Sequence, residues 1–411
     1  MKYKITTFNF TSSLLLTLHS NLRMRNLQIN KLILLILIYI FCGYGAISQP
    51  AKPATTHNLT AELKLQYGLL MSHHLELDIF RSHFPAFELS LQKATYGKHR
   101  WEAEYGYPLI GISFWYSGLG GFEELGTAFA VYPTINFPIV SDNYQSLNFK
   151  LGVGLGYLTN RFDRIDNYKN FAIGSHLNIA ASLFTEYRRK ISRMVTLSAG
   201  LGLTHFSNGS MKTPNYGLNI ITASVGLTSY LSNPNRSLDR KILPELYPFE
   251  FDGKKYLSVE FATAVAYKDM SQQYGKNYFV VAAYANIMAR VSYKSKFGVG
   301  LDLTYDASDK LNLERQYIPV TNDLHLTKLG INVAYELVMD RLSFLFNAGA
   351  YLSGMDRSEG EIYQRLTLKY FITNNLFANM VLSAHLGKAE YIGFGLGYRV
   401  KFIYKRKIKH D

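Results

Sequence analysis

The sequence predicts an all-β protein, a transmembrane antiparallel β-barrel fold with roughly sixteen strands in total. Many segments of about ten residues alternate apolar with polar or small side chains, as in strands with one face toward lipid and one toward a lumen. Composition agrees, since the chain has 31 Tyr, 26 Phe and 31 Gly and only 18% charged residues. A secreted β-sandwich or propeller is the soluble alternative.

The N-terminus has the features of an export signal over residues 1–48. Lys31 precedes the apolar run 32–42, and the small residues of 46–48 follow as a cleavage site. The basic and apolar regions of an ordinary signal both lie after Met24. We therefore expect Met24 to be the true start and the exported chain to begin near Gln49.

Charge and hydropathy limit the partners of the exported chain. The full chain carries a net charge of +14, and removal of the five basic residues within 1–48 leaves 39 − 30 = +9. This charge favours anionic partners such as lipid phosphates or nucleic acid. Export makes nucleic acid an improbable partner, which leaves lipid. Nothing after residue 49 approaches the ~18 to 20 consecutive apolar residues of a spanning helix, so any crossing of a membrane falls to strands.

The first eight strands are expected within residues 58–231, a unit with the length of one small barrel. Clusters of Gly, Asn, Asp, Ser and Lys mark the turns between them. The expected strands are 60–72, 85–96, 107–118, 126–140, 147–159, 175–189, 195–207 and 217–231.

A second set of strands is expected within residues 255–403. Its last member alternates most strictly, with Ile392 and Phe394 on one face and Gly393 and Gly395 on the other. The expected strands are 255–268, 277–292, 296–306, 324–339, 342–353, 362–373, 376–386 and 390–402. Residues 404–411 form a short basic tail.

Residues 232–254 form a linker rich in proline and charge, too long for an ordinary periplasmic turn. The linker separates two eight-stranded units, or it is an excursion within one larger barrel, and the sequence is consistent with both. An even number of strands places both termini on the periplasmic side. The connections 160–174 and 208–216 then face outward.

The stretch 205–219 carries the residues that point to chemistry. Leu197, Leu201 and Leu203 form an apolar row along one strand face, and His205 and Ser207 continue that row. Asn219 begins the apolar row of the next strand. Hairpin pairing would bring these three polar groups together at one end of the two strands.

This arrangement is the minimum for a serine esterase. His205 can take the hydroxyl proton of Ser207, and Asn219 can hold the other imidazole nitrogen. Asn208 and the amide of Gly209 can donate hydrogen bonds to the oxyanion of a tetrahedral intermediate, worth ~3 kcal/mol per donor. The alternative interpretation is that a His and a Ser at a strand end are ordinary interfacial residues.

The stretch His-Phe-Ser-Asn-Gly-Ser at 205–210, followed by Pro214-Asn215 and Gly217, resembles the signature of the outer-membrane lipid A deacylases, the PagL-like or acyloxyacyl hydrolase-related family. The resemblance implies an eight-stranded barrel with the motif on its last two strands, which residues 58–231 match. It implies a dyad of His205 and Ser207 with Asn208 in the oxyanion hole. The chain departs from the family at Asn219, where the best characterised members have Glu.

Two other groups of residues are weaker candidates. A cluster of histidines and acidic residues has no regular ligand spacing, so solvated loop residues are the better interpretation than a metal site: His73, His74, His83, Glu76 and Asp78. Three loop cations on the expected outer side are candidates for gripping lipid A phosphates, with solvated loop positions as the alternative: Arg161, Arg164 and Lys212.

The sequence therefore predicts an outer-membrane serine esterase that removes an ester-linked acyl chain from lipid A of lipopolysaccharide. This carboxylic ester hydrolase would need no metal and no cofactor. The alternative is a non-catalytic outer-membrane barrel, either a porin-like channel or a scaffold whose site has decayed at Asn219.

Overall fold

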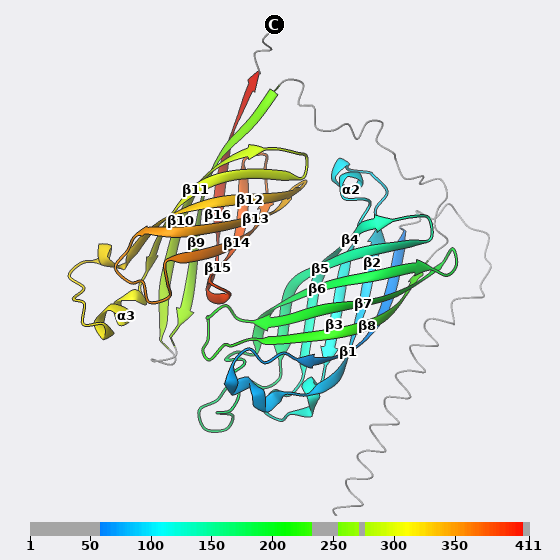
Figure 1. The fold of residues 1–411 in the computed structure, drawn as a ribbon, viewed down its shortest axis with the longest axis horizontal. Coiled ribbons are helices and arrows are strands. Elements are labelled where there is room, and N and C mark those ends of the chain that lie inside the picture. The colour runs from blue at the N-terminus through cyan, green and yellow to red at the C-terminus, as the bar shows by residue number, and fades with distance from the viewer. Residues whose placement is uncertain (1–57, 232–253, 271–275, 406–411) are drawn as a thin grey trace, which may run out of the picture. The chain divides into compact units, whose positions relative to one another are not determined.

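The computed structural model describes residues 58–231, 254–270 and 276–405. The predicted signal at 1–48, the linker residues 232–253 and the tail residues 406–411 lie outside these ranges. The described residues form sixteen strands in two closed antiparallel barrels of eight strands each, which confirms the predicted all-β barrel class (Figure 1). The two closed barrels exclude the single larger barrel, the other arrangement with which the linker sequence was consistent.

In the described ranges, no helix has the length and apolar character needed to cross a membrane.

The first barrel closes where β1 pairs with β8. Its short helical elements all lie in connections between strands: η1 (Leu75–Phe80), α2 (Arg100–Glu104) and η2 (Leu119–Gly121). Its strands are β1 (Leu59–Leu70), β2 (His83–Ala94), β3 (Leu109–Ser117), β4 (Ala128–Ser141), β5 (Gln145–Leu158), β6 (Leu177–Lys190), β7 (Val195–Ser207) and β8 (Leu218–Tyr230).

The second barrel closes where β16 pairs with β9. Helices α3 (Asp309–Arg315) and η3 (Asp323–Leu326) lie in one connection. Its strands are β9 (Lys254–Asp269), β10 (Asn277–Arg290), β11 (Ser295–Asp306), β12 (Thr327–Met339), β13 (Leu342–Ser353), β14 (Ile362–Phe371), β15 (Leu376–His385) and β16 (Lys388–Lys405). Strand β16 thus includes the first two residues of the predicted basic tail.

Alternation along the strands separates an apolar outer face from a polar interior. On β1, Leu65 and Tyr67 are each 60% exposed, whereas Glu62 and Lys64 are at most 1% exposed. Because an eight-stranded barrel is only wide enough for its own side chains, inward-facing polar groups meet one another across the lumen. The outer face is left with the aliphatic and aromatic residues, as expected for a lipid-facing surface.

Ion pairs cross the interior of the first barrel between strands that are not neighbours. The Lys64 Nζ lies 2.6 Å from Glu186 Oε2, and Lys150 on β5 pairs with Glu88 on β2. The Arg188 Nη1 donates to Glu62 Oε1 at 3.0 Å and to Glu186 Oε1 at 2.7 Å. Buried charges persist only when they are paired and hydrogen-bonded, and each of these meets that condition.

The second barrel has a network of the same kind. Lys296 Nζ lies 3.0 Å from Glu260 Oε1 and 2.9 Å from Glu336 Oε2. Lys369 Nζ lies 2.5 Å from the other oxygen of Glu260. Two lysines and two glutamates therefore balance one another in this layer of the lumen.

Candidate active site

The hairpin of β7 and β8 sets the faces of the predicted catalytic residues. His205 on β7 stands directly opposite Asn219 on β8. Thr204 and Phe206 are fully buried inside the barrel, where the Phe206 ring centroid lies 5.4 Å from that of Trp115. Since successive side chains alternate, His205 and Ser207 lie on the outer face together with the exposed Leu201.

The His205 imidazole is fixed by Asn219. His205 Nδ1 lies 2.6 Å from Asn219 Oδ1. An amide oxygen can only accept, so Nδ1 carries the proton and donates. Nε2 is then left unprotonated, which is the tautomer that a general base acting on a serine hydroxyl requires.

The Ser207 hydroxyl lies beside two donors from the loop that follows it. Its Oγ accepts from the backbone amide of Gly209 at 3.2 Å and from Asn215 Nδ2 at 2.9 Å. Within the described ranges, no hydrogen bond joins Ser207 to His205. In enzymes without substrate the bond between nucleophile and base is often made only when substrate binds, and the hydroxyl proton stays available for it.

Asn208, predicted as an oxyanion donor, is engaged in holding the loop. Its Nδ2 donates to Ser175 Oγ and to the Lys212 carbonyl, each at 2.9 Å. Its backbone amide donates to Asn215 Oδ1 at 3.1 Å. Both hydrogens of the Asn208 carboxamide are therefore already used. Of the two donors predicted for the oxyanion, Asn208 and Gly209, only the Gly209 amide contacts Ser207 among the described residues.

Asn215 is a site residue that sequence reasoning did not assign. It contacts both the Ser207 hydroxyl and the Asn208 amide, so it links nucleophile and loop. The strand pattern gave no indication of this contact, because Asn215 lies in the loop and not in the alternating row. Its position next to Pro214 in the quoted motif was the available signal.

His73 extends the site from a different part of the chain. Asn219 Nδ2 lies 3.1 Å from His73 Nδ1, and His73 Nε2 lies 2.7 Å from the Tyr216 carbonyl. The amide must donate and the carbonyl must accept, so His73 is protonated on Nε2. A single chain of hydrogen bonds thus runs from His205 through Asn219 to His73.

Of the other residues of the weak metal candidate, His74 lies beside His73, with ring centroids 4.8 Å apart, and His83 and Asp78 have other partners. His74 stacks on Tyr216 with ring centroids 4.1 Å apart, and burial lowers the pKa of His74. His83 stacks on Tyr67, and Asp78 pairs with Arg81. In the part of the chain that the structure describes, no three His, Cys, Asp or Glu residues are arranged to hold a metal ion.

Gly217 shapes the space around the imidazole. It has a φ of +81°, which L side chains rarely adopt, and a Cβ built on it would lie 3.0 Å from His205 Cε1. Any side chain here would strain the backbone and press on the His205 ring. The glycine of the motif therefore serves the placement of His205.

The three cations predicted to contact phosphate come from two loops. Arg161 and Arg164 are exposed in the connection between β5 and β6, and Lys212 is partly buried in the connection between β7 and β8. Only Lys212 is tied to the site, through its backbone contacts with Asn208. A phosphate-binding role for these residues stays a prediction.

Comparison with known families gave two matches along the chain. The model described as lipid A 3-O-deacylase (PagL) matches residues 86–228, from β2 into β8. The model described as the acyloxyacyl hydrolase C-terminal domain matches residues 257–402, from β9 into β16. The first match contains the whole of the hydrogen-bonded site except His73.

Comparison with curated proteins gave no match. Among solved structures, OccAB4 of Acinetobacter baumannii is 11% identical, with 86% of this chain and 100% of that chain covered and a TM-score of 0.20. The outer membrane protein Omp33 of Acinetobacter baumannii is 8% identical, with 84% and 100% covered and a TM-score of 0.17. Likenesses at this level carry no argument about function.

Proposed function

Because the chain belongs to the PagL-like family of lipid A deacylases, we propose that it is an outer-membrane esterase that removes an ester-linked acyl chain from lipid A of lipopolysaccharide. One observation carries the proposal. His205 donates from Nδ1 to Asn219, which leaves Nε2 as a base on the same outer face as Ser207.

In the proposed reaction the Ser207 Oγ attacks the ester carbonyl while His205 Nε2 takes the hydroxyl proton. The carbonyl oxygen becomes an oxyanion close to the Gly209 amide and the Asn215 carboxamide, the two groups that contact Ser207 Oγ. Such donors are worth ~3 kcal/mol each in the transition state. Asn208, assigned to this role from the sequence, instead keeps the loop in place through Ser175 and Lys212.

The second half of the reaction uses the same groups. The imidazolium of His205 gives its proton to the departing alcohol oxygen of lipid A, which leaves an acyl ester on Ser207. Water then attacks that ester while His205 takes its proton, and a fatty acid and the free serine are released. Asn219 holds the ring in one orientation throughout, although an amide stabilises the imidazolium less than a carboxylate does.

The surroundings of the site support a lipid substrate. Leu201 and Val225 are 67% and 57% exposed on the outer face of the same two strands. Outward aliphatic residues below an outward serine let an acyl chain remain in hydrocarbon while its ester reaches the hydroxyl. Arg161, Arg164 and Lys212 are the proposed contacts for the phosphates of lipid A.

Mass spectrometry of lipid A tests this function. Cells that make the wild-type chain should contain lipid A lighter by one acyl chain than cells that lack it, and cells that make Ser207→Ala should match the latter. Full deacylation by Ser207→Ala would refute the proposed mechanism.

A non-catalytic channel is the rival, and it makes the opposite prediction. It would conduct ions in planar bilayers and leave lipid A unchanged. The ion pairs that cross the lumen of each barrel argue against conduction, because an open path requires breaking buried charge pairs.

A further inference from the structure

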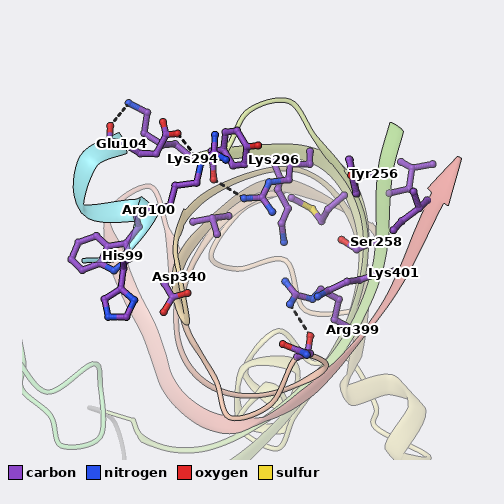
Figure 2. Close-up of a pocket in the computed structure, with 18 of the residues that line it drawn as sticks. His99, Arg100, Glu104, Tyr256, Ser258, Lys294, Lys296, Asp340, Arg399 and Lys401 are labelled. Carbon is purple, nitrogen blue, oxygen red and sulfur yellow. Dashed lines mark hydrogen bonds and ion pairs between the residues drawn. The ribbon is translucent and has the colours of Figure 1, made fainter. Parts of the chain in front are cut away.

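The end of the second barrel where β9 begins and β16 ends, here called the terminal mouth, is rich in positive charge. Arg399 and Lys401 follow the inward glycines of β16, whose other face carries the exposed Phe394 and Leu396. Their parity therefore turns both toward the lumen. Figure 2 shows Arg399 and Lys401 entering the ring of strands, with Lys296 on another wall.

Arg290 is a further cation of the terminal mouth. It ends β10, and its inward parity follows from the fully buried Met288 two residues before it. The charges of Arg290 and Arg399 repel each other, and both repel that of Lys401. Three cations are thus held together in one opening against their mutual repulsion.

No carboxylate of the described residues forms an ion pair with Arg290, Arg399 or Lys401. Glu260 and Glu336 attract Arg399 from beyond ion-pair distance, and they already hold Lys296 and Lys369. Asp340 in the turn between β12 and β13 also lines the terminal mouth, again without an ion pair among the described residues. The excess positive charge is therefore local to the opening.

The two guanidinium groups are fixed in place but not neutralised. Arg399 lies 3.9 Å from the Phe371 ring centroid and donates from Nη2 to the Asn374 carbonyl at 2.8 Å, while its buried Nε has no partner. Arg290 donates to the carbonyls of Ser292 and Tyr293. Neutral carbonyls orient these groups, and several of the five N–H donors of each stay available to an anion.

From these observations we propose that the terminal mouth of the second barrel binds a phosphate group through Arg399, Arg290 and Lys401. A planar guanidinium fits two phosphate oxygens at once, and a lysine adds a point charge. A phosphate monoester carries a charge of about −1.5 to −2 at neutral pH. Such a ligand neutralises more of the charge of three cations than one carboxylate, with a charge of −1, would. The group could be a phosphate monoester on a lipid headgroup or free inorganic phosphate, since both present at least three non-bridging oxygens and a similar charge.

Two titrations of the full chain test this site and separate the two sources. Inorganic phosphate is titrated by calorimetry into protein in a zwitterionic detergent. In parallel, retention of phosphatidic acid, whose headgroup is a phosphate monoester, against phosphatidylcholine is measured by native mass spectrometry from nanodiscs. We expect saturable binding in at least one arm, weakened at least about tenfold by Arg399→Gln and by Lys401→Gln. Arg341→Gln should bind like wild type, because Arg341 is exposed at the same end but does not line the mouth.

Binding only in the first arm identifies free phosphate as the ligand, and binding only in the second identifies a lipid headgroup. Absence of saturable binding in both arms overturns the proposal, as does an equal loss in Arg341→Gln. Arg399 packs on Phe371, so its replacement risks the fold. Lys401 is exposed, and Lys401→Gln, checked for the heat-modifiable migration of a folded barrel, keeps the test decisive.

Discussion

The two barrels share their architecture and differ at the connection within their last hairpin. In the first barrel, residues 208–217 join β7 to β8, and His205 and Ser207 face outward. In the second, only Leu386 and Gly387 join β15 to β16, and the residues two apart near the strand end are Ser383 and His385, each 5% exposed. Ser383 donates to Glu390 at 3.1 Å, and His385 contacts Tyr351.

The difference shows that a histidine and a serine two residues apart do not make a site by themselves. One step of strand register turns such a pair from the lipid face to the lumen, where it joins a buried network. The long loop matters equally, since it brings the Asn215 and Gly209 donors to the serine. Side-chain parity and loop length together distinguish the pair proposed to react, His205 and Ser207, from the buried pair Ser383 and His385.

The largest expected effect is on the deacylation rate, and it should separate replacement of Ser207 from replacement of Ser383. Ser207→Ala should lower deacylation by about 10³-fold or more, because it removes the nucleophile. Ser383→Ala should leave the rate unchanged, since that hydroxyl faces the interior of the other barrel. Release of labelled fatty acid from lipid A in mixed micelles measures both, and a comparable loss in Ser383→Ala would contradict the assignment of the reaction to the first barrel.

The next effect concerns the ion pairs of the two lumens. Lys150→Met and Lys369→Met should each cost about 3–5 kcal/mol of folding free energy, because each leaves a buried carboxylate uncompensated. Denaturant unfolding measures this cost, with the exposed Lys310→Met as a neutral control. Activity should fall with Lys150→Met only, and an equal fall with Lys369→Met would show that the second barrel supports the site.

A smaller effect is expected at Asn219. Asn219→Ala removes the hydrogen bond that orients His205 and should lower kcat about tenfold or more. Asn219→Glu supplies a carboxylate that stabilises the imidazolium and should raise kcat, about tenfold by the same reasoning. Steady-state kinetics on lipid A measure kcat for both variants. A lower kcat for Asn219→Glu than for wild type would contradict this expectation and would indicate that the hydrogen bond from Asn219 Nδ2 to His73 is needed.

The smallest effect distinguishes two histidines of one loop region. His73→Ala removes the acceptor for Asn219 Nδ2, a hydrogen bond worth about 1 kcal/mol, so kcat should fall about fivefold. His83→Ala should leave kcat unchanged, because the His83 ring, at the start of β2, stacks on Tyr67 of β1 and not on a residue of the site. A matching decrease in both variants would point to loop stability and not to the orientation of Asn219.

Much of the fold was predictable because alternation encodes both the strand and its face. Strand β7 begins and ends where the pattern of Leu197 to Leu203 and its continuation predicted, at Val195 and Ser207. The division into two barrels was not predictable, since it depends on β1 pairing with β8 and β9 pairing with β16. Those pairings join residues far apart in the sequence, and no local pattern specifies them.

Only those contacts of the site that are set by the pairing of two strands could be predicted from the sequence. The contact of His205 with Asn219 was predicted because both head apolar rows on adjacent strands. His73 and Asn215 were missed as site residues because loop conformation decides their positions. Asn208 was assigned by closeness in sequence to Ser207, but its side chain turns toward Ser175 and Lys212.

The outward placement of Ser207 has a kinetic consequence. In the proposed reaction the Ser207 hydroxyl, which opens onto the apolar face, would meet lipid A by two-dimensional diffusion. The encounter rate would then depend on the mole fraction of lipid A among neighbouring amphiphiles and not on its bulk concentration. Adding inert detergent at constant enzyme and lipid A should therefore slow turnover by surface dilution. The released fatty acid should depart sideways into the same leaflet, where its accumulation would inhibit the enzyme.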